Sequence, residues 1–327
     1  MFRRLTVKWI IAAAKTASLA LALSFMAIIT YTPFATPIAA PSKPQEWRIL
    51  DTSTGASIAF EEFAPRLAGA DVIYLGEQHR NRAHIEAAIT VLEVLRQRQR
   101  LPILGLEMFS WDGQTALDRY LLDTTAAKMQ FLQEARWQEN WGGVYEEYEP
   151  LVEIARRHHL PIIALNPPRP LVRKIAKEGL RPEALDAEMG RWGMRGEKFV
   201  QDPAYQDTIL EQLRACHRGL PPDAYQRMYE ASLFRDEGMA KTISDAAGRL
   251  SEAGPIVSYT GAGHIQYRLP IPNRVARRRP ELRQITVYLV ALDPAEAEDL
   301  DRLVKPAIAD YLWFTPLSQH GPPVRCS

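Results

Sequence analysis

The chain has 327 residues, of which 46% are hydrophobic, and its 40 basic and 39 acidic residues leave a formal net charge of +1. This amount of apolar material is enough for a packed core and excludes global disorder. The near-neutral balance, with arginines scattered along the chain, gives no electrostatic reason to expect nucleic acid as a partner.

Residues 1–44 form a segment distinct from the folded part. Basic residues between Arg3 and Lys15 precede an apolar run from Ala17 to Ile29, and small residues follow up to Ala40. This order is typical of a secretory signal peptide. We expect an exported chain, either periplasmic or membrane-anchored and facing outside the cytoplasm, whose amino terminus contacts the membrane during export or as an anchor. The apolar run is short for a span of roughly 20 residues, and the sequence leaves open whether the leader is cleaved.

From about residue 45 onward, short apolar runs alternate with longer amphipathic stretches. The runs predict strands at 72–75, 103–106, 161–165, 256–259 and 284–290, with a sixth strand at an edge of the sheet at 311–314. Strands that are apolar throughout and separated by helices predict a mostly parallel sheet with helices on both faces. We therefore expect a single α/β domain over 45–327, with a helical insertion at about 180–250 that serves as a lid between the third and fourth strands.

Polar residues follow the first four predicted strands at the point where each strand ends. They are Glu77, His79, Glu107, Asn166, Arg169 and His264. Ligands of open parallel sheets bind beyond the carboxyl ends of the strands, which share one edge. The sequence therefore predicts a functional site at this edge, with Asn166 and Arg169 in supporting roles.

Each of these residues also has a simpler interpretation. Glu77 and His79 could cap the helix that follows them, and Asn166 belongs to an Asn-Pro-Pro run that is ordinary turn chemistry. Glu107 is harder to explain in this way, because a carboxylate in an apolar strand is costly to bury without a partner. His264 follows glycines, which let the backbone approach a ligand closely.

Two histidines and two carboxylates at one edge have two chemical uses. Nitrogen and oxygen ligands of this number suit a divalent transition metal, which could activate water for hydrolysis. Alternatively, a Glu–His pair without metal could act by general acid–base catalysis. The sequence has no serine nucleophile elbow, phosphate-binding loop or dinucleotide fingerprint, which argues against serine hydrolase, kinase-like and NAD-dependent functions.

The sequence contains two cysteines, Cys216 and Cys326. They could pair in an exported chain, but the position of Cys326 near the tail favours two unpaired thiols. His84 lies on a predicted helix, and we expect it to be solvated.

Several segments resemble the ChaN-like haem-binding uptake family, within the Tiki and erythromycin-esterase-like superfamily. In chain order they are Leu75-Gly-Glu-Gln-His79, Gly105-Leu-Glu-Met-Phe109, Pro161-Ile-Ile-Ala-Leu-Asn166, Arg235-Asp-Glu-Gly-Met-Ala240 and Gly261-Ala-Gly-His264. The tail Asp310-Tyr-Leu-Trp-Phe-Thr315 is similar too, so the resemblance covers about 47–315.

The resemblance implies two functions. ChaN-type members are associated with haem binding and iron acquisition, with a tyrosine ligand to the haem iron at a homodimer interface. Tiki-type members are metal-dependent proteases. This resemblance implies that His79, Glu107 and His264 hold a divalent metal such as manganese, zinc or cobalt, and that Glu77 joins them as a fourth catalytic residue. The esterase branch would make His79 a general base assisted by Glu107.

Four tyrosines are candidate haem ligands. Tyr225 and Tyr229 lie four residues apart on a predicted helix, and Tyr145 and Tyr148 lie in an aromatic loop with Trp141. A tyrosinate ligand requires an apolar pocket with a cation nearby; the simpler interpretation is that they are half-buried tyrosines of a helical lid. We expect an exported haem-binding protein involved in haem or iron uptake, with a metal-dependent or acid–base hydrolase as the alternative.

Overall fold

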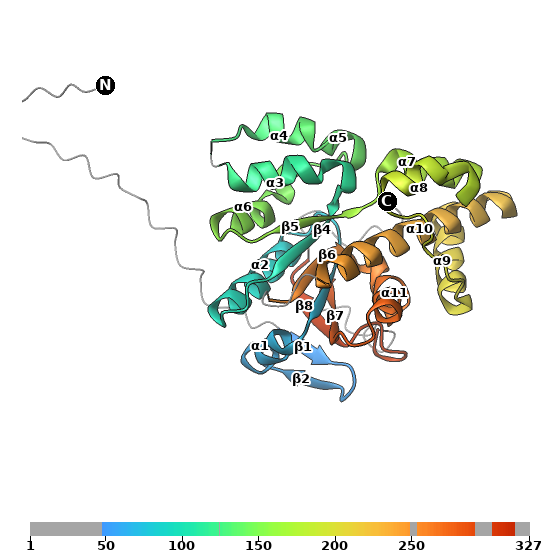
Figure 1. The fold of residues 1–327 in the computed structure, drawn as a ribbon. Helices are drawn as coiled ribbons and strands as arrows, with labels where there is room; N and C mark the ends of the chain where they lie inside the picture. Colours follow the sequence, from blue (N-terminus) through green and yellow to red (C-terminus); the bar gives the residue numbers. More distant parts are fainter. Residues whose placement is uncertain (1–47, 124, 249–253, 292–302, 318–327) are drawn as a thin grey trace, which may run out of the picture. The chain divides into compact units, whose positions relative to one another are not determined.

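The structure is a computed structural model that describes residues 48–123, 125–248, 254–291 and 303–317 (Figure 1). The expected leader and membrane anchor at 1–44 lie outside these residues. Residues 45–327 cluster into one compact unit. In the part of the chain that the structure describes, no helix is long and apolar enough to cross a membrane.

An eight-stranded sheet forms the centre of the domain, in the order β2-β1-β8-β7-β3-β6-β4-β5. Six strands run parallel, and a short hairpin of β1 and β2 adds antiparallel strands at one edge. The strands are β1 (Arg48–Asp51), β2 (Ala56–Ile58), β3 (Val72–Glu77), β4 (Ile103–Ser110), β5 (Ile162–Asn166), β6 (Ile256–Gly261), β7 (Gln284–Ala291) and β8 (Tyr311–Thr315). The predicted α/β class with a mostly parallel sheet is confirmed.

One detail of the strand prediction is wrong. The strand expected at an edge is β8, and it lies inside the sheet between β7 and β1. The hairpin that covers its outer side has strands of only four and three residues, which are too short to show a period in the sequence.

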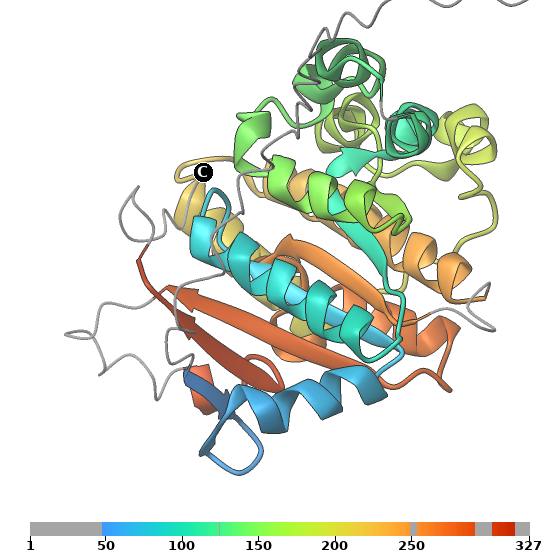
Figure 2. The same ribbon diagram turned by 90° about the vertical axis from the view of Figure 1, so that its left-hand side faces the viewer.

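Helices cover both faces of the sheet, as the apolar strands predict. The helices α1 (Phe60–Gly69), α2 (Arg82–Gln97), α3 (Gln114–Leu122) and α6 (Glu149–Arg157) pack on one face, and α10 (Pro222–Ala247) and α11 (Ile271–Arg278) on the other. In Figure 2, α1 and α2 cross in front of the sheet. Alternate residues of β3 show this arrangement. Ile73 and Leu75 belong to the core under α1, α2, α3 and α6, whereas Val72 and Tyr74 belong to the core under α10 and α11.

The helical insertion between β5 and β6 comprises α7 (Arg169–Glu178), α8 (Asp186–Arg191), α9 (Pro203–Cys216) and α10. The second half of α10 packs on the sheet through Met239 and Ile243. Its first half packs against α7 and α8 through Phe234, and against α9 through Tyr229 and Leu233. The insertion therefore shares its longest helix with the core of the domain. Two short helices, α4 (Lys128–Glu134) and α5 (Trp137–Asn140), lie between β4 and β5 along the chain.

Two smaller predictions need correction. Cys216 is disulfide-bonded rather than an unpaired thiol; Cys326, the other cysteine in the sequence, lies outside the described residues. His84 is fully buried rather than solvated, because its Nδ1 accepts a hydrogen bond from the backbone N–H of Gln78 at 2.9 Å. Burial lowers the pKa of His84 to about 3, so this imidazole is neutral and supports the loop that carries His79.

Candidate functional site

The order of the strands brings the predicted site residues together. The strands β3, β6, β4 and β5 are neighbours in the sheet, so their carboxyl ends form a continuous stretch of one edge. This stretch carries Glu77, the turn from Gly261 to His264, Glu107 and Asn166 in that spatial order. Five of the six predicted residues, including His79, meet there; Arg169 lies beside them and donates from Nη1 to the Trp141 carbonyl at 3.2 Å.

Glu77 and His79 form one pair of this cluster. Oε1 of the buried Glu77 is hydrogen-bonded to His79 Nδ1, and Tyr259 OH donates to Oε2 at 3.2 Å. The His79 side chain is 38% exposed, and its ring meets Trp141 edge-on with 5.0 Å between centroids. The capping interpretation does not apply, since Asn81 caps α2.

Opposing effects set the protonation of this pair. Burial raises the pKa of Glu77, and His79 only partly offsets that rise. Burial works to lower the pKa of His79, but the Glu77 carboxylate outweighs it and the pKa is raised. The pair therefore holds a proton on or near the imidazole.

Glu107 anchors the second pair. Its Oε1 lies 2.7 Å from Arg235 Nη2 and 3.2 Å from His264 Nε2, and its Oε2 accepts from the Gly261 backbone N–H at 2.6 Å. Burial works to raise the pKa of Glu107, but His264, His79 and Arg235 together hold it well below its usual range. This buried carboxylate is ionised, and its oxygens are fully engaged.

His264 lies between two carboxylates. Its Nδ1 is 2.5 Å from Asp236 Oδ1, and its Nε2 faces Glu107. Burial works to lower its pKa, but Glu107 and Asp236 raise it to about 9. At neutral pH His264 is thus an imidazolium with both ring nitrogens engaged, which suits a fixed positive charge better than a general base.

The sequence did not single out several residues of this cluster. Arg235 and Asp236 come from the middle of α10, and Arg235 Nε also donates to Asn166 Oδ1 at 3.2 Å. Both belong to a segment of the family resemblance, which was the one available signal. Tyr259 reads as an ordinary core residue of β6, and its contact with Glu77 depends on the pairing of β6 with β3.

The donor set does not fit a divalent metal. Within the described ranges, no three or more His, Cys, Asp or Glu side chains are grouped so that they could hold a metal ion. The reason at Glu107 is that Arg235 and His264 already occupy Oε1 as cations. The structure also pairs His79 with Glu77, whereas the esterase branch would assign Glu107 as its helper.

A glycine allows the His79 ring to approach the backbone closely. A Cβ atom added at Gly261 would lie 3.0 Å from His79 Cε1, 3.1 Å from Nε2 and 3.5 Å from Glu107 Oε2. Contacts this short force neighbouring atoms to move. The His79 ring therefore packs directly against the bare backbone of Gly261, and only glycine fits at this position.

The four candidate tyrosines lie in two separate places. Tyr145 and Tyr148 pack around Trp137 with centroids 5.2 and 6.3 Å away, and Tyr148 OH accepts from the Arg80 backbone N–H at 3.2 Å. On α10, Tyr229 OH donates to Gln201 Oε1 at 2.7 Å, and Tyr225 OH donates to the His217 carbonyl. Burial raises the pKa of Tyr145, Tyr148 and Tyr229, which keeps these three as neutral phenols.

Two surface cavities lie away from this cluster. One of about 280 Å³ is lined by Lys177, Gly179 and Arg227 among others. The other, of about 590 Å³, is lined by residues that include Lys241 and Arg278. The strand-end residues line neither cavity.

Comparisons with known proteins identify the family. A family model described as "Haem-binding uptake, Tiki superfamily, ChaN" matches residues 63–275. A structure of cofacial haem binding to ChaN of Campylobacter jejuni has a TM-score of 0.63 at 19% identity, covering 83% of this chain and 97% of that chain. An erythromycin esterase mutant in its open conformation has a TM-score of 0.45 at 15% identity, covering 74% and 76%.

A curated relative is Protein RETICULATA-RELATED 5, chloroplastic, of Arabidopsis thaliana, which is 25% identical over 264 residues. The match covers 76% of this chain and 35% of that protein, so the chain spans about a third of the relative's length. The ChaN structure supports the fold described above. Because the family model covers well over half of the sequence, the chain belongs to the ChaN family of haem-binding uptake proteins in the Tiki superfamily.

Proposed function

We propose that this chain is an exported haem-binding protein that acts in haem or iron uptake. The observation that carries the proposal is the family match over residues 63–275. The fold similarity to ChaN of Campylobacter jejuni, a protein described with cofacially bound haem, supports it. The haem is the cargo of such a protein. Its site need not coincide with the residues gathered at the carboxyl ends of the strands, here called the strand-end cluster: Glu77, His79, Glu107, Asn166, Arg235, Asp236 and His264.

Accessibility decides which candidate tyrosine could bind haem iron. An iron ligand must present its oxygen to the flat face of the porphyrin, which a hydroxyl inside the core cannot do. All four tyrosines are buried, but Tyr145, Tyr148 and Tyr229 are almost completely so, whereas Tyr225 keeps 9% of its surface exposed. Its hydroxyl has a backbone carbonyl as its partner, that of His217, just after α9. Tyr225 therefore fits an iron ligand better than the other three.

Titration of the purified full chain with haemin tests this proposal. We expect a saturable change of the Soret band and a tyrosinate-type spectrum. Tyr225→Phe should abolish that spectrum, because the phenyl ring has no oxygen for the iron. Tyr74→Phe is the matched control: Tyr74 is buried in β3, and its hydroxyl donates to Gln284 Oε1 at 2.7 Å.

The possible results separate the parts of the proposal. An absorption change that never saturates, equal to that of free haemin, would contradict haem binding. Saturable binding could instead survive Tyr225→Phe and be lost with Tyr229→Phe, Tyr145→Phe or Tyr148→Phe. That result would support haem binding but assign the iron ligand to the other tyrosine. Loss of binding with Tyr74→Phe would show that the readout reports folding alone.

Export and dimer formation are further parts of this proposal. Export is supported by the basic, apolar and small-residue order of 1–44. Expression of the full chain with a carboxyl-terminal tag, followed by fractionation and mass measurement, should show it outside the cytoplasm; recovery in the cytosol would contradict export.

The family suggests a homodimer that binds haem between its subunits. Sedimentation should then show a larger species with haemin than without it.

We propose acid–base hydrolysis as a second candidate function, which the hydrogen bond between Glu77 and His79 favours. Because the His79 side chain is 38% exposed, water or a substrate hydroxyl could give a proton to its Nε2, while Glu77 holds Nδ1. A carboxylate that orients the imidazole in this way is the usual support of a general base. Glu107, Arg235 and His264 would supply fixed charges next to the reacting group.

Turnover of a panel of esters and peptides tests this candidate. His79→Asn should abolish turnover, whereas His159→Asn should not, because His159 is exposed and outside the cluster. Turnover should rise with pH as His79, whose pKa is raised, loses its proton. Equal turnover in both variants would contradict the assignment. Turnover that a chelator removes and manganese or zinc restores would instead favour the metal-dependent route.

A further inference from the structure

A tyrosine from the helical insertion reaches the hydrogen-bonded chain of the strand-end cluster. Tyr205, in the first turn of α9, donates from its hydroxyl to Asp236 Oδ2 at 2.6 Å. The other oxygen of Asp236 is the partner of His264 Nδ1 at 2.5 Å. Tyr205 and Asp236 are both buried. Tyr205 is therefore two hydrogen bonds away from the imidazolium that faces Glu107.

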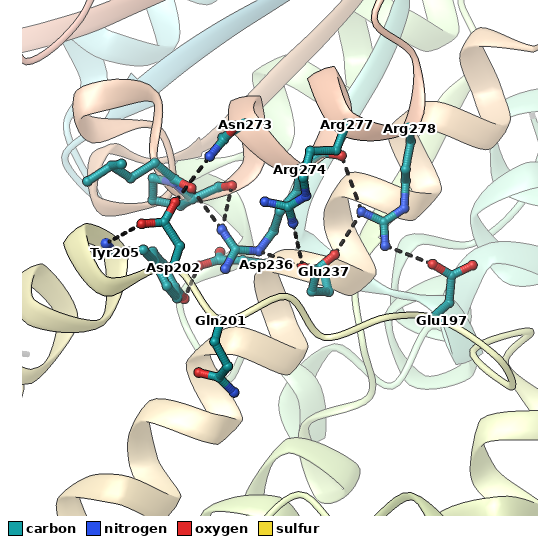
Figure 3. A network of polar contacts seen from close by, with 12 residues as sticks. Glu197, Gln201, Asp202, Tyr205, Asp236, Glu237, Asn273, Arg274, Arg277 and Arg278 are labelled. Atoms are coloured by element: carbon teal, nitrogen blue, oxygen red, sulfur yellow. Dashed lines mark hydrogen bonds and ion pairs between the residues drawn. The ribbon is translucent and has the colours of Figure 1, made fainter.

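The surroundings of Tyr205 fix its ring and its backbone. The guanidinium of Arg274, a fully buried residue of α11, lies 4.0 Å from the ring centroid. Asp202, the N-cap of α9, accepts from the Tyr205 backbone N–H at 3.2 Å and from Asn273 Nδ2 at 3.2 Å. Figure 3 shows these groups side by side between α9, α10 and α11. The position of the hydroxyl is thus set by α11 and by the start of α9.

Arg274 is itself held by a buried carboxylate. Its Nε lies 3.1 Å from Glu237 Oε1, and Arg277 and Arg278 contact the same carboxylate at 2.8 and 2.7 Å (Figure 3). Glu237 is the residue after Asp236 on α10. The arginine group therefore ties α11 to the same turn of α10 that supports His264.

The chemistry of Asp236 explains what the Tyr205 hydroxyl adds. A carboxylate with one free oxygen can rotate and offer either oxygen to an imidazole. With Tyr205 on Oδ2, the Oδ1 atom is left to His264, and the plane of the carboxylate is fixed. Burial, with Asp236 adding to it, raises the pKa of Tyr205 well above its usual value, so the hydroxyl stays a donor. Supporting contacts of this kind orient the groups of functional sites.

We propose that Tyr205 is a positioning residue for His264, acting through Asp236, so that α9 of the helical insertion completes the strand-end cluster. Displacement of α9 would free Asp236 Oδ2 and allow the imidazole of His264 to turn away from Glu107. The insertion is then part of the site's machinery rather than only its cover. The inference does not depend on haem binding, since it concerns the chain without ligand.

Nuclear magnetic resonance of the full, ligand-free chain with ¹⁵N-labelled histidine tests the proposal. The His264 ring resonances are assigned by their loss in His264→Asn. Tyr205→Phe removes only the hydroxyl, and we expect it to shift the His264 Nδ1–H resonance and weaken the protection of that proton from solvent exchange. Tyr74→Phe is the matched control, because its hydroxyl bonds to Gln284 at the start of β7, at the opposite edge of the sheet.

Two outcomes would overturn the proposal. One is an unchanged His264 resonance in folded Tyr205→Phe protein, and the other is an equal shift in Tyr74→Phe. If Tyr205→Phe does not fold, Asp202→Ala replaces it, since it removes the acceptor of the Tyr205 backbone N–H without touching Asp236. We expect a smaller shift of the His264 resonance in the same direction. No shift in folded Asp202→Ala protein would contradict the coupling.

Discussion

Replacing Glu107 by glutamine is the perturbation that probes the cluster most severely. The carboxylate accepts from Gly261 and faces the cations Arg235 and His264. Glutamine has the same size but no charge, and one of its polar atoms is a donor. The variant therefore places a neutral amide against two cations that are only partly exposed to water.

The size of the effect follows from burial. Removing one partner of a buried ion pair costs about 3–5 kcal/mol, because the other charge is left uncompensated. The side chains of Arg235 and His264 are 29% and 17% exposed, so water solvates them in part and reduces the cost. We expect a loss of about 2–4 kcal/mol at neutral pH, which corresponds to a fall in melting temperature on the order of 5–15 °C for a domain of this size.

Thermal and urea denaturation, followed by circular dichroism, measure this loss. Glu281→Gln is the matched control, because its pair with Arg279 lies at the surface and such pairs contribute little to stability. A melting temperature of Glu107→Gln equal to that of the wild type, with an intact spectrum, would refute the reasoning. It would mean that the two cations do not depend on this carboxylate.

Stability should also depend on pH through His264, whose pKa is raised from 6.5 to about 9 by Glu107 and Asp236. Its contribution to the free energy of unfolding, on the order of 3 kcal/mol, is complete below pH 6.5 and is lost as the pH rises through about 9. Denaturation that shows no loss of stability across this range would contradict the contacts of His264 with the two carboxylates. Gly261→Ala should displace the His79 ring and shift its resonances, whereas Gly263→Ala, whose added Cβ would meet nothing within 4 Å, should not; equal shifts would contradict the tight contact. His84→Leu should speed amide hydrogen exchange in the 78–81 loop, because the backbone N–H of Gln78 loses its acceptor, His84 Nδ1. Unchanged exchange would show that the conformation of the loop does not depend on this hydrogen bond.

The strand ends could be read from the sequence because their pattern is local. Each apolar run is followed at once by a polar residue, and parallel strands share their carboxyl edge, so Glu77, Glu107 and His264 could be assigned to one edge. Their partners could not be assigned in this way. The position of β6 between β3 and β4 depends on the packing of the whole sheet, and that position brings the backbone of Gly261 against Glu107.

Residues on helices were harder to assign than residues at strand ends. Asp236 lies in the middle of a 26-residue helix, where an acidic residue usually faces solvent. It is buried here, and its carboxylate is bonded by His264 and Tyr205, which approach from two other segments. His84 was misjudged for the same reason, since its partner is a backbone N–H of the preceding loop. Hydrogen bonds between distant segments leave no period in the sequence.

A crystal structure of the full chain grown with haemin is the measurement that bears most directly on this account. It should show haem iron bonded to Tyr225, with Glu107, His264 and Asp236 still joined as they are described above. Crystals saturated with haemin that contain no ordered haem would contradict the proposed function. If the crystal contains ordered haem but the side chains of Glu107 and His264 point to separate faces of the domain, the assembled cluster is contradicted.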